Sequence, residues 1–472
     1  MYYYLEGKNI MKRDLSADAK ISVPERLSYT CGNIGNCIGL AIISMYMMYY
    51  YKDILHINAG MIATIMLISR VFDGVTDIFM GCVVDRTHSS KGKARVWLLR
   101  GAVPYILSVI GIFFVPSGAS DMVKYIYIFV MYNLANAVFG TVVNTAYNSM
   151  NSLITKNSYE TGILGIFGMV GAMVGTNLVG SYALKIIEMF GSGERAWHMG
   201  ITLMGMIGLL FLLVCYYGVR ERVTETQEQA ENPLPVGVIV KNLLKNKYWL
   251  MVGLSYVLIM FFNGIYSTSL LYYCKGVLGN TDYMTSIMNM TAMPQIVATI
   301  CAAFFVKKFG KGNTFRIGNV ILIIGFAIRA VAGPFAPVQI FCGLLYGIGY
   351  GLATSEILGM LADTVEYGLW KTNVRIVGSA FAVMSFAAKI GNGLGSSVVG
   401  WLIEWSGYNA DALVQSRTAV FSITACSVYI PLVMTVVMLF IMFFYNLDKN
   451  FAQIILDNKK REESRYAEGS SR

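Results

Sequence analysis

Long apolar segments follow one another along almost the whole chain, with only short polar stretches between them. A bilayer core about 30 Å thick is crossed by a helix of about 20 predominantly apolar residues. The pattern therefore predicts an all-α membrane protein with twelve transmembrane helices. They are expected over residues 29–51, 59–84, 97–115, 122–150, 161–187, 196–219, 248–274, 283–306, 315–332, 338–361, 377–405 and 418–447.

The longest polar interruption divides these helices six and six, so the chain is expected to have two bundles. In order, the parts are a cytoplasmic N-terminal segment, an N-terminal six-helix bundle, a cytoplasmic linker, a C-terminal six-helix bundle and a cytoplasmic tail: residues 1–28, 29–219, 220–247, 248–447 and 448–472. In the tail, Phe451, Ile454 and Ile455 have helical spacing and precede a basic stretch. This predicts a short amphipathic helix on an anionic membrane surface, and a solvated tail is the alternative.

Composition excludes a soluble protein. Of 472 residues, 56% are hydrophobic and 14% are charged, whereas an average soluble domain carries about 25% charge. The net charge of +10 does not indicate nucleic-acid binding, because 27 of the 37 lysines and arginines fall in segments that face the cytoplasm if both termini do. We expect a monomer in the plasma (inner) membrane, with the bilayer as partner. No ATP-binding or hydrolase motif is present, so neither a cofactor nor an enzyme activity is expected.

Three charged residues lie inside the second predicted helix. Arg70, Asp73 and Asp77 share one helical face, and the two carboxylates are one turn apart. Ionisable groups inside a membrane cost several kcal/mol unless they are paired or hydrated, and they mark functional sites. Because carboxylate oxygens are ligands for hard cations, the pair predicts a Na⁺ or H⁺ site. The alternative is a structural Arg–Asp network.

A lysine in the eleventh predicted helix, Lys389, has no carboxylate within one turn. Its partner must come from another helix, and Asp73, Asp77 or Glu356 would serve. Such a bridge between the bundles would couple their movement. Glu356 has a second interpretation, as a structural partner for Arg329.

Polar residues are also spread through other apolar segments, where they must face the interior of the bundle. Four asparagines form a stripe along the fourth predicted helix, which indicates either hydrogen bonding between helices, at about 0.6 kcal/mol per bond, or the lining of a hydrophilic cavity. They are Asn133, Asn136, Asn144 and Asn148. Others are Asn33, Asn36, Asn263, Asn289, Gln295 and Asn392.

Two long motifs in opposite halves resemble those of a known family. The segment 69–81 reads SRVFDGVTDIFMG and is followed by Asp85-Arg86-Thr87, Lys91-Gly92-Lys93 and Arg95-Val96-Trp97. The segment 362–368 reads ADTVEYG and precedes Lys371 and Arg375. Both closely resemble the signatures of the glycoside-pentoside-hexuronide/cation symporters, whose best-known member is melibiose permease. The resemblance implies a major facilitator fold with two bundles that rock about a site near the midplane.

The same resemblance implies roles for particular residues. Asp73, Asp77 and Thr141 match cation-site positions, and Thr76 replaces the family's asparagine, which leaves Na⁺ or H⁺ open. The family's arginine in the fifth helix is Gly168 here, so galactoside specificity does not carry over, and a larger glycoside or another substrate could fill the space. The substrate-binding candidates are Asn36, Asn144, Asn148, Lys389 and Thr354.

These observations predict a cation-coupled symporter that carries a sugar or glycoside into the cell by alternating access. The alternative is a porter of an amphiphilic or lipid-like substrate on the same fold. Basic loops and acidic residues at the cytoplasmic side are expected to pair when that side closes. The coupling and gating candidates are Arg70, Asp85, Arg86, Asp363, Glu366, Arg375 and Glu356.

Overall fold

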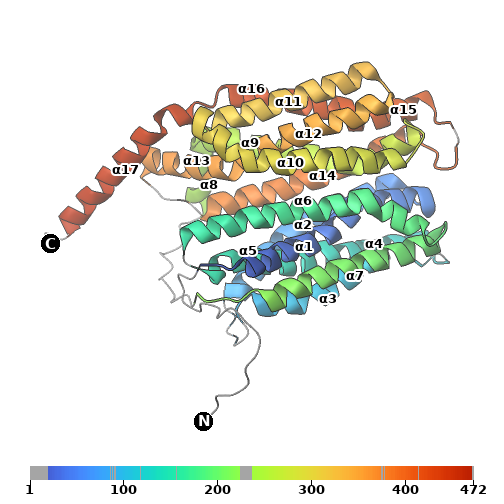
Figure 1. Ribbon diagram of the computed structural model, residues 1–472, viewed down its shortest axis with the longest axis horizontal. Helices are drawn as coiled ribbons and strands as arrows, with labels where there is room; N and C mark the ends of the chain where they lie inside the picture. Colours follow the sequence, from blue (N-terminus) through green and yellow to red (C-terminus); the bar gives the residue numbers. More distant parts are fainter. Residues whose placement is uncertain are drawn as a thin grey trace, which may run out of the picture.

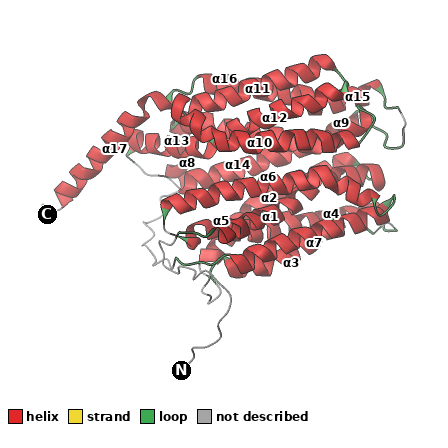
Figure 2. Cartoon of the chain, in the orientation of Figure 1, coloured by secondary structure: helices red, strands yellow, loops and turns green. Residues whose placement is uncertain are grey.

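The computed structural model describes residues 20–469 except 86, 88, 90–91, 117, 156, 224–235, 374–375, 377 and 413. Every regular element in this part of the chain is a helix (Figure 2). The first group comprises α1 (Val23–Tyr49), the π-helical turn η1 (Tyr50–Ile54), α2 (Ala59–Asp85), α3 (Arg95–Gly111), α4 (Asp121–Asn133), η2 (Leu134–Gly140), α5 (Thr141–Ile154), α6 (Ser158–Glu188) and α7 (Glu194–Gly218).

The second group begins with α8 (Val236–Lys245) and ends with the C-terminal helix α17 (Leu447–Gly469). Between them lie α9 (Lys247–Gly276), α10 (Asp282–Phe309), α11 (Lys311–Ala332), α12 (Ala336–Ser355), α13 (Ile357–Thr372), α14 (Gly378–Trp405), α15 (Arg417–Thr424), η3 (Ala425–Tyr429) and α16 (Ile430–Phe443).

Each predicted apolar segment coincides with a helix or with consecutive helices, but two details differ. The segment 338–361 is interrupted at Glu356, where α12 ends and α13 begins. The expected linker contains α8, whose hydrophobic residues were not recognised as a helix. In the described residues nine helical segments are long and apolar enough to cross a membrane, so the number twelve stays a prediction.

Local sequence signals explain several helix starts. Proline occupies the first turn of α1 and α12, where its missing N–H is not needed for helical hydrogen bonding. The side chain of Asn246 accepts a hydrogen bond from the backbone N–H of Trp249 and so caps α9. Near the start of α3, the Glu221 carboxylate accepts three backbone N–H groups, from Lys93, Ala94 and Arg95, at 2.6–3.0 Å.

The helices form two adjacent groups, with α1–α7 on one side and α9–α16 on the other (Figure 1). Within the first group α1 packs against α6 and α7, and within the second α9 packs against α14 and α16. The groups meet along three helix pairs: α2 with α14, α6 with α10, and α1 with α9. These pairs bring residues far apart in sequence into contact.

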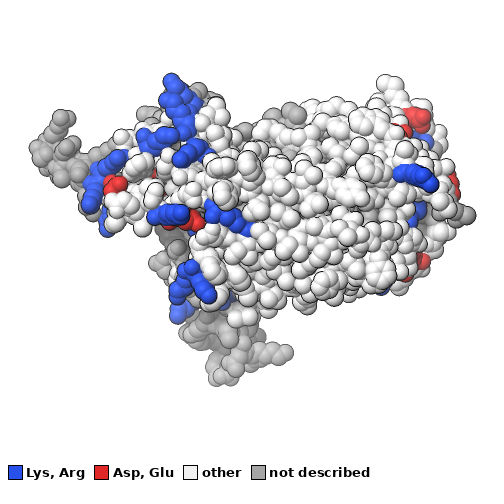
Figure 3. Space-filling view, turned by 90° about the horizontal axis from the view of Figure 1, so that it is seen from above, with Lys and Arg blue, Asp and Glu red and all other residues white. Residues whose placement is uncertain are grey.

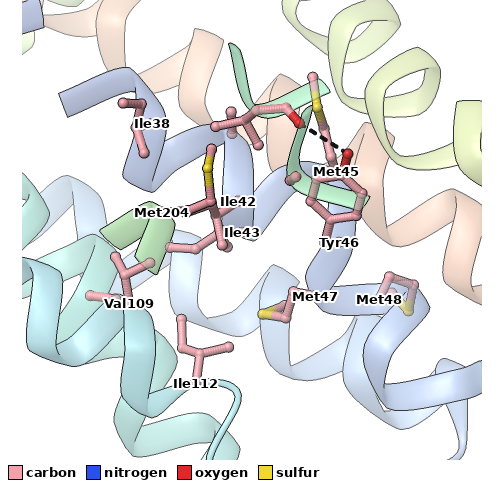
Figure 4. Packing of buried hydrophobic residues seen from close by; sticks show 14 of the residues in the cluster. Ile38, Ile42, Ile43, Met45, Tyr46, Met47, Met48, Val109, Ile112 and Met204 are labelled. Carbon is pink, nitrogen blue, oxygen red and sulfur yellow. Dashed lines mark hydrogen bonds between the residues drawn. The ribbon is translucent and has the colours of Figure 1, made fainter. Parts of the chain in front are cut away.

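The first helix lies at the centre of the buried core. Its side chains Ile38, Ile42 and Tyr46 are fully buried, and they pack near Val109 of α3 and Met204 of α7 (Figure 4). The hydroxyl of Tyr46 donates a hydrogen bond to the carbonyl of Val179 on α6 at 3.1 Å. Aromatic and β-branched side chains thus hold α1 between its neighbours.

Charged side chains gather at the two ends of the molecule and leave a broad uncharged band between them on the face shown in Figure 3. Lysines and arginines are concentrated at one end, where α1 begins, α5 and α13 end and α17 begins. We call this the basic end. The opposite end carries η1, the start of α2 and the connection between α14 and α15. An apolar band of this kind is what a bilayer core requires.

The predicted tail helix is confirmed as α17, but its apolar side packs on the protein. Ile454 is buried, and it joins a cluster in which Phe451 also packs. On α13 the indole N–H of Trp370 donates to the Asp457 carboxylate at 3.2 Å. These contacts show that α17 is neither solvated on all sides nor held by lipid alone.

Candidate functional site

Asp73 is the centre of a charged cluster that joins three helices. Its carboxylate is buried, with 4% of the residue exposed. It accepts hydrogen bonds from Arg70 of the same helix at 3.4 Å, from the hydroxyl of Thr141 on α5 at 3.2 Å and from the ammonium of Lys389 on α14 at 3.2 Å. The expected partner of Lys389 from the other group of helices is therefore Asp73.

Two glycines allow α2 and α14 to approach closely around this cluster. A Cβ atom at Gly393 would overlap the side chain of Arg70, and one at Gly74 would overlap the ring of Phe386. The guanidinium of Arg70 also lies 5.9 Å from the centre of the Tyr132 ring. Small residues at both crossings let the charged side chains reach across the interface.

Of the other two cation-site candidates, Thr76 makes no described contact with the Asp73 carboxylate. The hydroxyl of Thr76 donates to backbone carbonyls of its own helix, those of Phe72 and Asp73, at 3.2 and 3.0 Å. Asp77 lies one turn further along α2, but its side chain is outside the described residues. No group of three or more His, Cys, Asp or Glu residues suited to a metal ion occurs among the residues described.

The three predicted substrate-binding asparagines form a cluster between α1 and α5. The side-chain oxygen of Asn144 accepts hydrogen bonds from Asn36 and from Asn148, each at 3.3 Å. The side-chain oxygen of Asn36 is buried and has no hydrogen-bond partner in the described structure. Asn148 is exposed. We call this trio the first amide cluster.

The space beside Gly168 is filled by aromatic side chains. A Cβ atom there would lie 2.9 Å from the Tyr147 hydroxyl and 3.4 Å from the Tyr29 ring, and these two rings stack at 4.5 Å. Asn33 also donates a hydrogen bond to the Gly168 carbonyl at 2.8 Å. The space that a side chain at position 168 would enter is therefore already occupied, and the expectation that a larger substrate could fill it is wrong.

The remaining C-terminal candidates lie nearer the basic end. The Thr354 hydroxyl donates to the Tyr350 carbonyl of its own helix at 2.7 Å. The Asp363 carboxylate pairs with Lys311 at 2.8 Å, a contact between α11 and α13 of the same group. Glu366 accepts a bond from Asn458 of α17 at 3.4 Å. Arg86 and Arg375, and the side chain of Asp85, are outside the described residues.

The interpretation of Glu356 as the partner of Arg329 is wrong. Arg329 is in the last turn of α11, and its Nε donates to the side chain of Gln339 at 2.6 Å. Its guanidinium lies 5.3–5.6 Å from three aromatic rings, which belong to Tyr266, Tyr273 and Phe326. Cation–π contacts thus stabilise this buried charge. Glu356 is instead the residue between α12 and α13. Its carboxylate and the Lys311 ammonium lie 3.6 and 3.5 Å from the position that a Cβ atom would take at Gly359.

Sequence reasoning missed a set of charged contacts at the opposite end. Lys52 of η1 pairs with Glu404 of α14 at 2.9 Å. The Glu404 carboxylate also accepts bonds from the Asn58 side chain and from the backbone N–H of Ala59. It therefore caps the start of α2 from the other group of helices.

The neighbouring residue, Asp53, makes a second bridge between the two groups. Its carboxylate, with the side chain fully buried, accepts bonds from Lys275 of α9 at 2.6 Å and from the hydroxyl of Tyr408 at 2.8 Å. Burial and the adjacent carboxylate raise the pKa of Tyr408, so this phenol stays a hydrogen-bond donor. The adjacent Lys52–Asp53 pair at the end of the first apolar segment was the available sequence signal.

The family assignment rests on a match to nearly the whole chain. A family model described as MFS/sugar transport protein matches residues 28–449. The chain belongs to this family. The resemblance seen in the two sequence motifs is thereby confirmed, and so is the all-α major facilitator fold. The family consists of transporters, so the protein is a multi-pass membrane transporter and not an enzyme.

Individual relatives of the chain are distant, but the similarity extends over most of its length. It is 27% identical to an isoprimeverose transporter of Lactiplantibacillus pentosus over 453 residues, which cover 93% of this chain and 91% of that protein. It is 26% identical to a putative glycoside/cation symporter of Escherichia coli (strain K12), and the match covers 91% of this chain and 93% of that protein.

A solved structure shows the same fold. It is a bacterial homologue of the human lysosomal transporter Spinster in an inward-facing and unoccupied conformation, with a TM-score of 0.66, 13% sequence identity, and 92% and 99% of the two chains covered. At this identity the likeness establishes the fold of the family member, and its chemistry must be argued from its own residues.

Proposed function

We propose that the protein is a symporter that couples the entry of a sugar or glycoside to a cation, Na⁺ or H⁺, by alternating access. The observation that carries the proposal is the ion pair between Asp73 and Lys389, which joins the two groups of helices inside the apolar band. Family membership and the names of the relatives, an isoprimeverose transporter and a putative glycoside/cation symporter, support it.

The cluster suggests how a cation controls the carrier. Asp73 already faces two cationic side chains, Arg70 and Lys389. A bound Na⁺ or proton competes with the Lys389 ammonium for the carboxylate, with the Thr141 hydroxyl as a further oxygen ligand. Release of Lys389 weakens the α2–α14 contact and frees an ammonium for the substrate. By linkage, the cation and the substrate strengthen each other's binding equally.

Asp77 and Thr76 remain in the proposal as further oxygen ligands. Their positions on α2 follow Asp73 within about one turn. If the helix rotates slightly about its axis when the cation binds, the Thr76 oxygen can turn from its own backbone toward the ion. The first amide cluster, with Lys389 and Thr354, is proposed to bind the substrate.

The contacts between the two groups indicate which side is closed. The bridges Lys52–Glu404 and Asp53–Lys275 tie the groups at the opposite end. Each described ion pair at the basic end stays within one group or links that group to the connection that follows it, as in Arg26–Glu160, Glu25–Arg222 and Lys311–Asp363. We infer that the carrier is open toward the basic end.

The orientation follows from charge. Basic residues are concentrated on the cytoplasmic side of membrane proteins, so we propose that the basic end and both termini are cytoplasmic and that the conformation is inward-facing. The division into bundles at residues 29–219 and 248–447, with cytoplasmic segments at 1–28, 220–247 and 448–472, belongs to this proposal.

Closure of the cytoplasmic side requires new pairs between the bundles. Lys311 and Asp363 now neutralise each other within the C-terminal bundle. We propose that Glu366, together with Asp363 while it stays paired with Lys311, contacts basic residues of the N-terminal bundle, such as Arg86, when the carrier opens outward. Asp85, Arg375 and Glu356 complete the proposed gating set.

Uptake into proteoliposomes tests the function. Labelled neutral glycosides should accumulate when a Na⁺ gradient is imposed at constant pH, or when a proton gradient is imposed without Na⁺. Asp73→Asn should abolish accumulation and retain substrate binding, because the amide cannot hold the cation. The matched control is Asp121→Asn, since that side chain is 85% exposed at the start of α4. Undiminished accumulation by Asp73→Asn would refute the assignment.

A further inference from the structure

A second polar cluster, outside the predicted site, lies in the C-terminal group of helices. The amide of Asn263 on α9 donates a hydrogen bond to the hydroxyl of Tyr350 on α12 at 3.1 Å. The amide of Asn392 on α14 donates to the side-chain oxygen of Asn263 at 3.4 Å. All three residues are partly exposed. We call this trio the second amide cluster.

The ring of Tyr350 is held by a column of aromatic side chains. It stacks on Tyr346 at 5.4 Å with 7° between the ring planes, and Tyr346 stacks on Tyr266 at 4.5 Å. Phe262 packs against the same three rings, with centroids 5.8–6.2 Å away. Offset stacking of this kind restrains a ring, so the Tyr350 hydroxyl has a fixed position.

Helix geometry places the cluster just inside the closed end. The Thr268 hydroxyl of α9 donates to the Ser44 carbonyl of α1, and the Ser397 hydroxyl of α14 donates to the Ala63 carbonyl of α2. Asn263 precedes Thr268 by five residues, and Asn392 precedes Ser397 by five. At a rise of 1.5 Å per residue, both amides lie about 7.5 Å toward the basic end from these contacts.

The first amide cluster lies at a comparable depth. Asn36 precedes Ser44 by eight residues on α1, or about 12 Å toward the basic end from the same contact. One cluster therefore belongs to each group of helices, on α1 and α5 in one and on α9, α12 and α14 in the other. Both lie where a ligand that enters from the basic end would reach the closed contacts.

The unused hydrogen-bonding groups define the ligand chemistry. In the described structure the hydroxyl hydrogen of Tyr350, one N–H of Asn263 and the side-chain oxygen of Asn392 have no partner. The side-chain oxygen of Asn36 is likewise unpaired, and the Asn144 amide donates no bond. Mixed donors and acceptors match sugar hydroxyls, which are both. A carboxylate or sulfonate only accepts hydrogen bonds, so it would leave these unpaired acceptor oxygens without a donor.

We propose that the second amide cluster binds one ring of a neutral two-ring glycoside while the first amide cluster binds the other ring. This rests on the proposed sugar transport and adds the substrate class. A ligand held by both clusters connects the two groups of helices on the side that must close. Substrate binding itself then favours closure of the cytoplasmic side.

Hydrogen bonding between helices is the competing explanation, and variants distinguish the two. Equilibrium exchange is measured in proteoliposomes at saturating cation, with the pairs xylose and xylobiose, glucose and cellobiose, and galactose and melibiose as probes. Asn392→Ala and Tyr350→Phe should each raise the KM of the transported disaccharide about tenfold, the effect of about 1.4 kcal/mol, and change the KM of its monosaccharide less than about twofold.

Matched controls lie beside each variant. Tyr346→Phe removes a hydroxyl from the same aromatic column outside the cluster, and Ser396→Ala removes one a turn further along α14, where it contacts the Gly264 carbonyl of α9. Both should leave KM for every probe unchanged. Asn36→Ala should raise the KM of monosaccharide and disaccharide alike.

Equal losses for one-ring and two-ring probes, or a lower melting temperature with unchanged KM, would overturn the second amide cluster as a binding site. If the wild-type carrier exchanges monosaccharides and none of the disaccharides, the two-ring assignment fails and sugar transport stands. If it exchanges no sugar of any kind, both proposals fail.

Discussion

The two ends of the molecule use ionic side chains differently. At the opposite end, Lys52 and Asp53 reach from η1 to Glu404 and Lys275 in the other group of helices. At the basic end, the described pair Lys311–Asp363 stays inside one group. Ion pairs therefore join the two groups of helices at the opposite end. At the basic end they only stabilise the packing within one group.

This difference indicates which contacts determine the free-energy difference between the two conformations. An ion pair between groups must break when that end opens, whereas a pair within a group can persist through the cycle. Burial increases the cost of breaking, since a buried charge that loses its partner is strongly destabilising. Asp53 and Asp363 are both buried, so the two ends differ in whether the ion pair must break and not in burial. The ion pairs at the opposite end should therefore dominate the balance between the inward-facing and the outward-open conformation.

The largest expected effect comes from locking the opposite end. With Lys52→Cys and Glu404→Cys in one chain, a short bismaleimide should lower uptake about tenfold or more, because alternation requires these positions to separate. Each single variant should show the same uptake before and after treatment with the reagent, because it has no second cysteine at this contact to be linked. A linked double variant with normal uptake would show that this end does not open.

A comparable link at the basic end should have little effect. The pair Lys311→Cys and Asp363→Cys joins α11 and α13, which belong to one group. After linking, uptake should stay within about twofold of the untreated double variant. A loss as large as that at the opposite end would mean that α11 and α13 also move apart, and the comparison of the two ends would fail.

Reversing the buried bridge should have the next largest effect. Asp53→Lys places two ammonium groups together at the closed end, and uptake should fall about tenfold. The double variant Asp53→Lys with Lys275→Asp restores opposite charges and should recover a substantial part of the uptake, as a double-mutant cycle measures. No recovery would mean that Asp53 acts through some contact other than Lys275.

A smaller effect is expected from Tyr408→Phe. It removes one hydrogen bond to Asp53, which has its bond to Lys275 left. The loss of about 1–2 kcal/mol should shift the carrier toward the outward-open state, with a few-fold change in the rate of uptake. Labelling of Lys52→Cys by a membrane-impermeant thiol reagent added outside should become faster. Unchanged labelling would contradict the role of this bond.

The smallest effect is expected from Lys311→Ala at the basic end. Its pair with Asp363 stays within one group of helices, so the loss of this pair affects both conformations alike and leaves the balance between them unchanged. The melting temperature of the purified protein should fall by only a few degrees, and the apparent affinity for substrate should not change. A loss of coupling comparable to that of Asp73→Asn would place Lys311 in the transport mechanism.

The positions of the helices could be read from the sequence, because each apolar segment is its own signal. The charged residues Arg70, Asp73 and Lys389 could be recognised as well, since a charge inside an apolar segment needs a partner. The choice among the possible partners could not, and Arg329 shows why. In the structure it is paired with Gln339 and aromatic rings, and not with Glu356. A linear sequence offers both acceptors equally and does not show which one lies close.

Hydrophobic periodicity and intramembrane charge were sufficient to determine the membrane location, the helical fold and the residues that require partners, since these properties depend on local composition and on the cost of burying polar groups in lipid. Only the tertiary structure decided that Asp73 meets Lys389, that Tyr147 fills the space beside Gly168, and that Asp53 and Glu404 bridge the closed end. The contacts of Asp73, Asp53 and Glu404 depend on how two groups of helices pack, which is set by shape complementarity between segments hundreds of residues apart. The Tyr147 contact depends on packing between α5 and α6 within the first group.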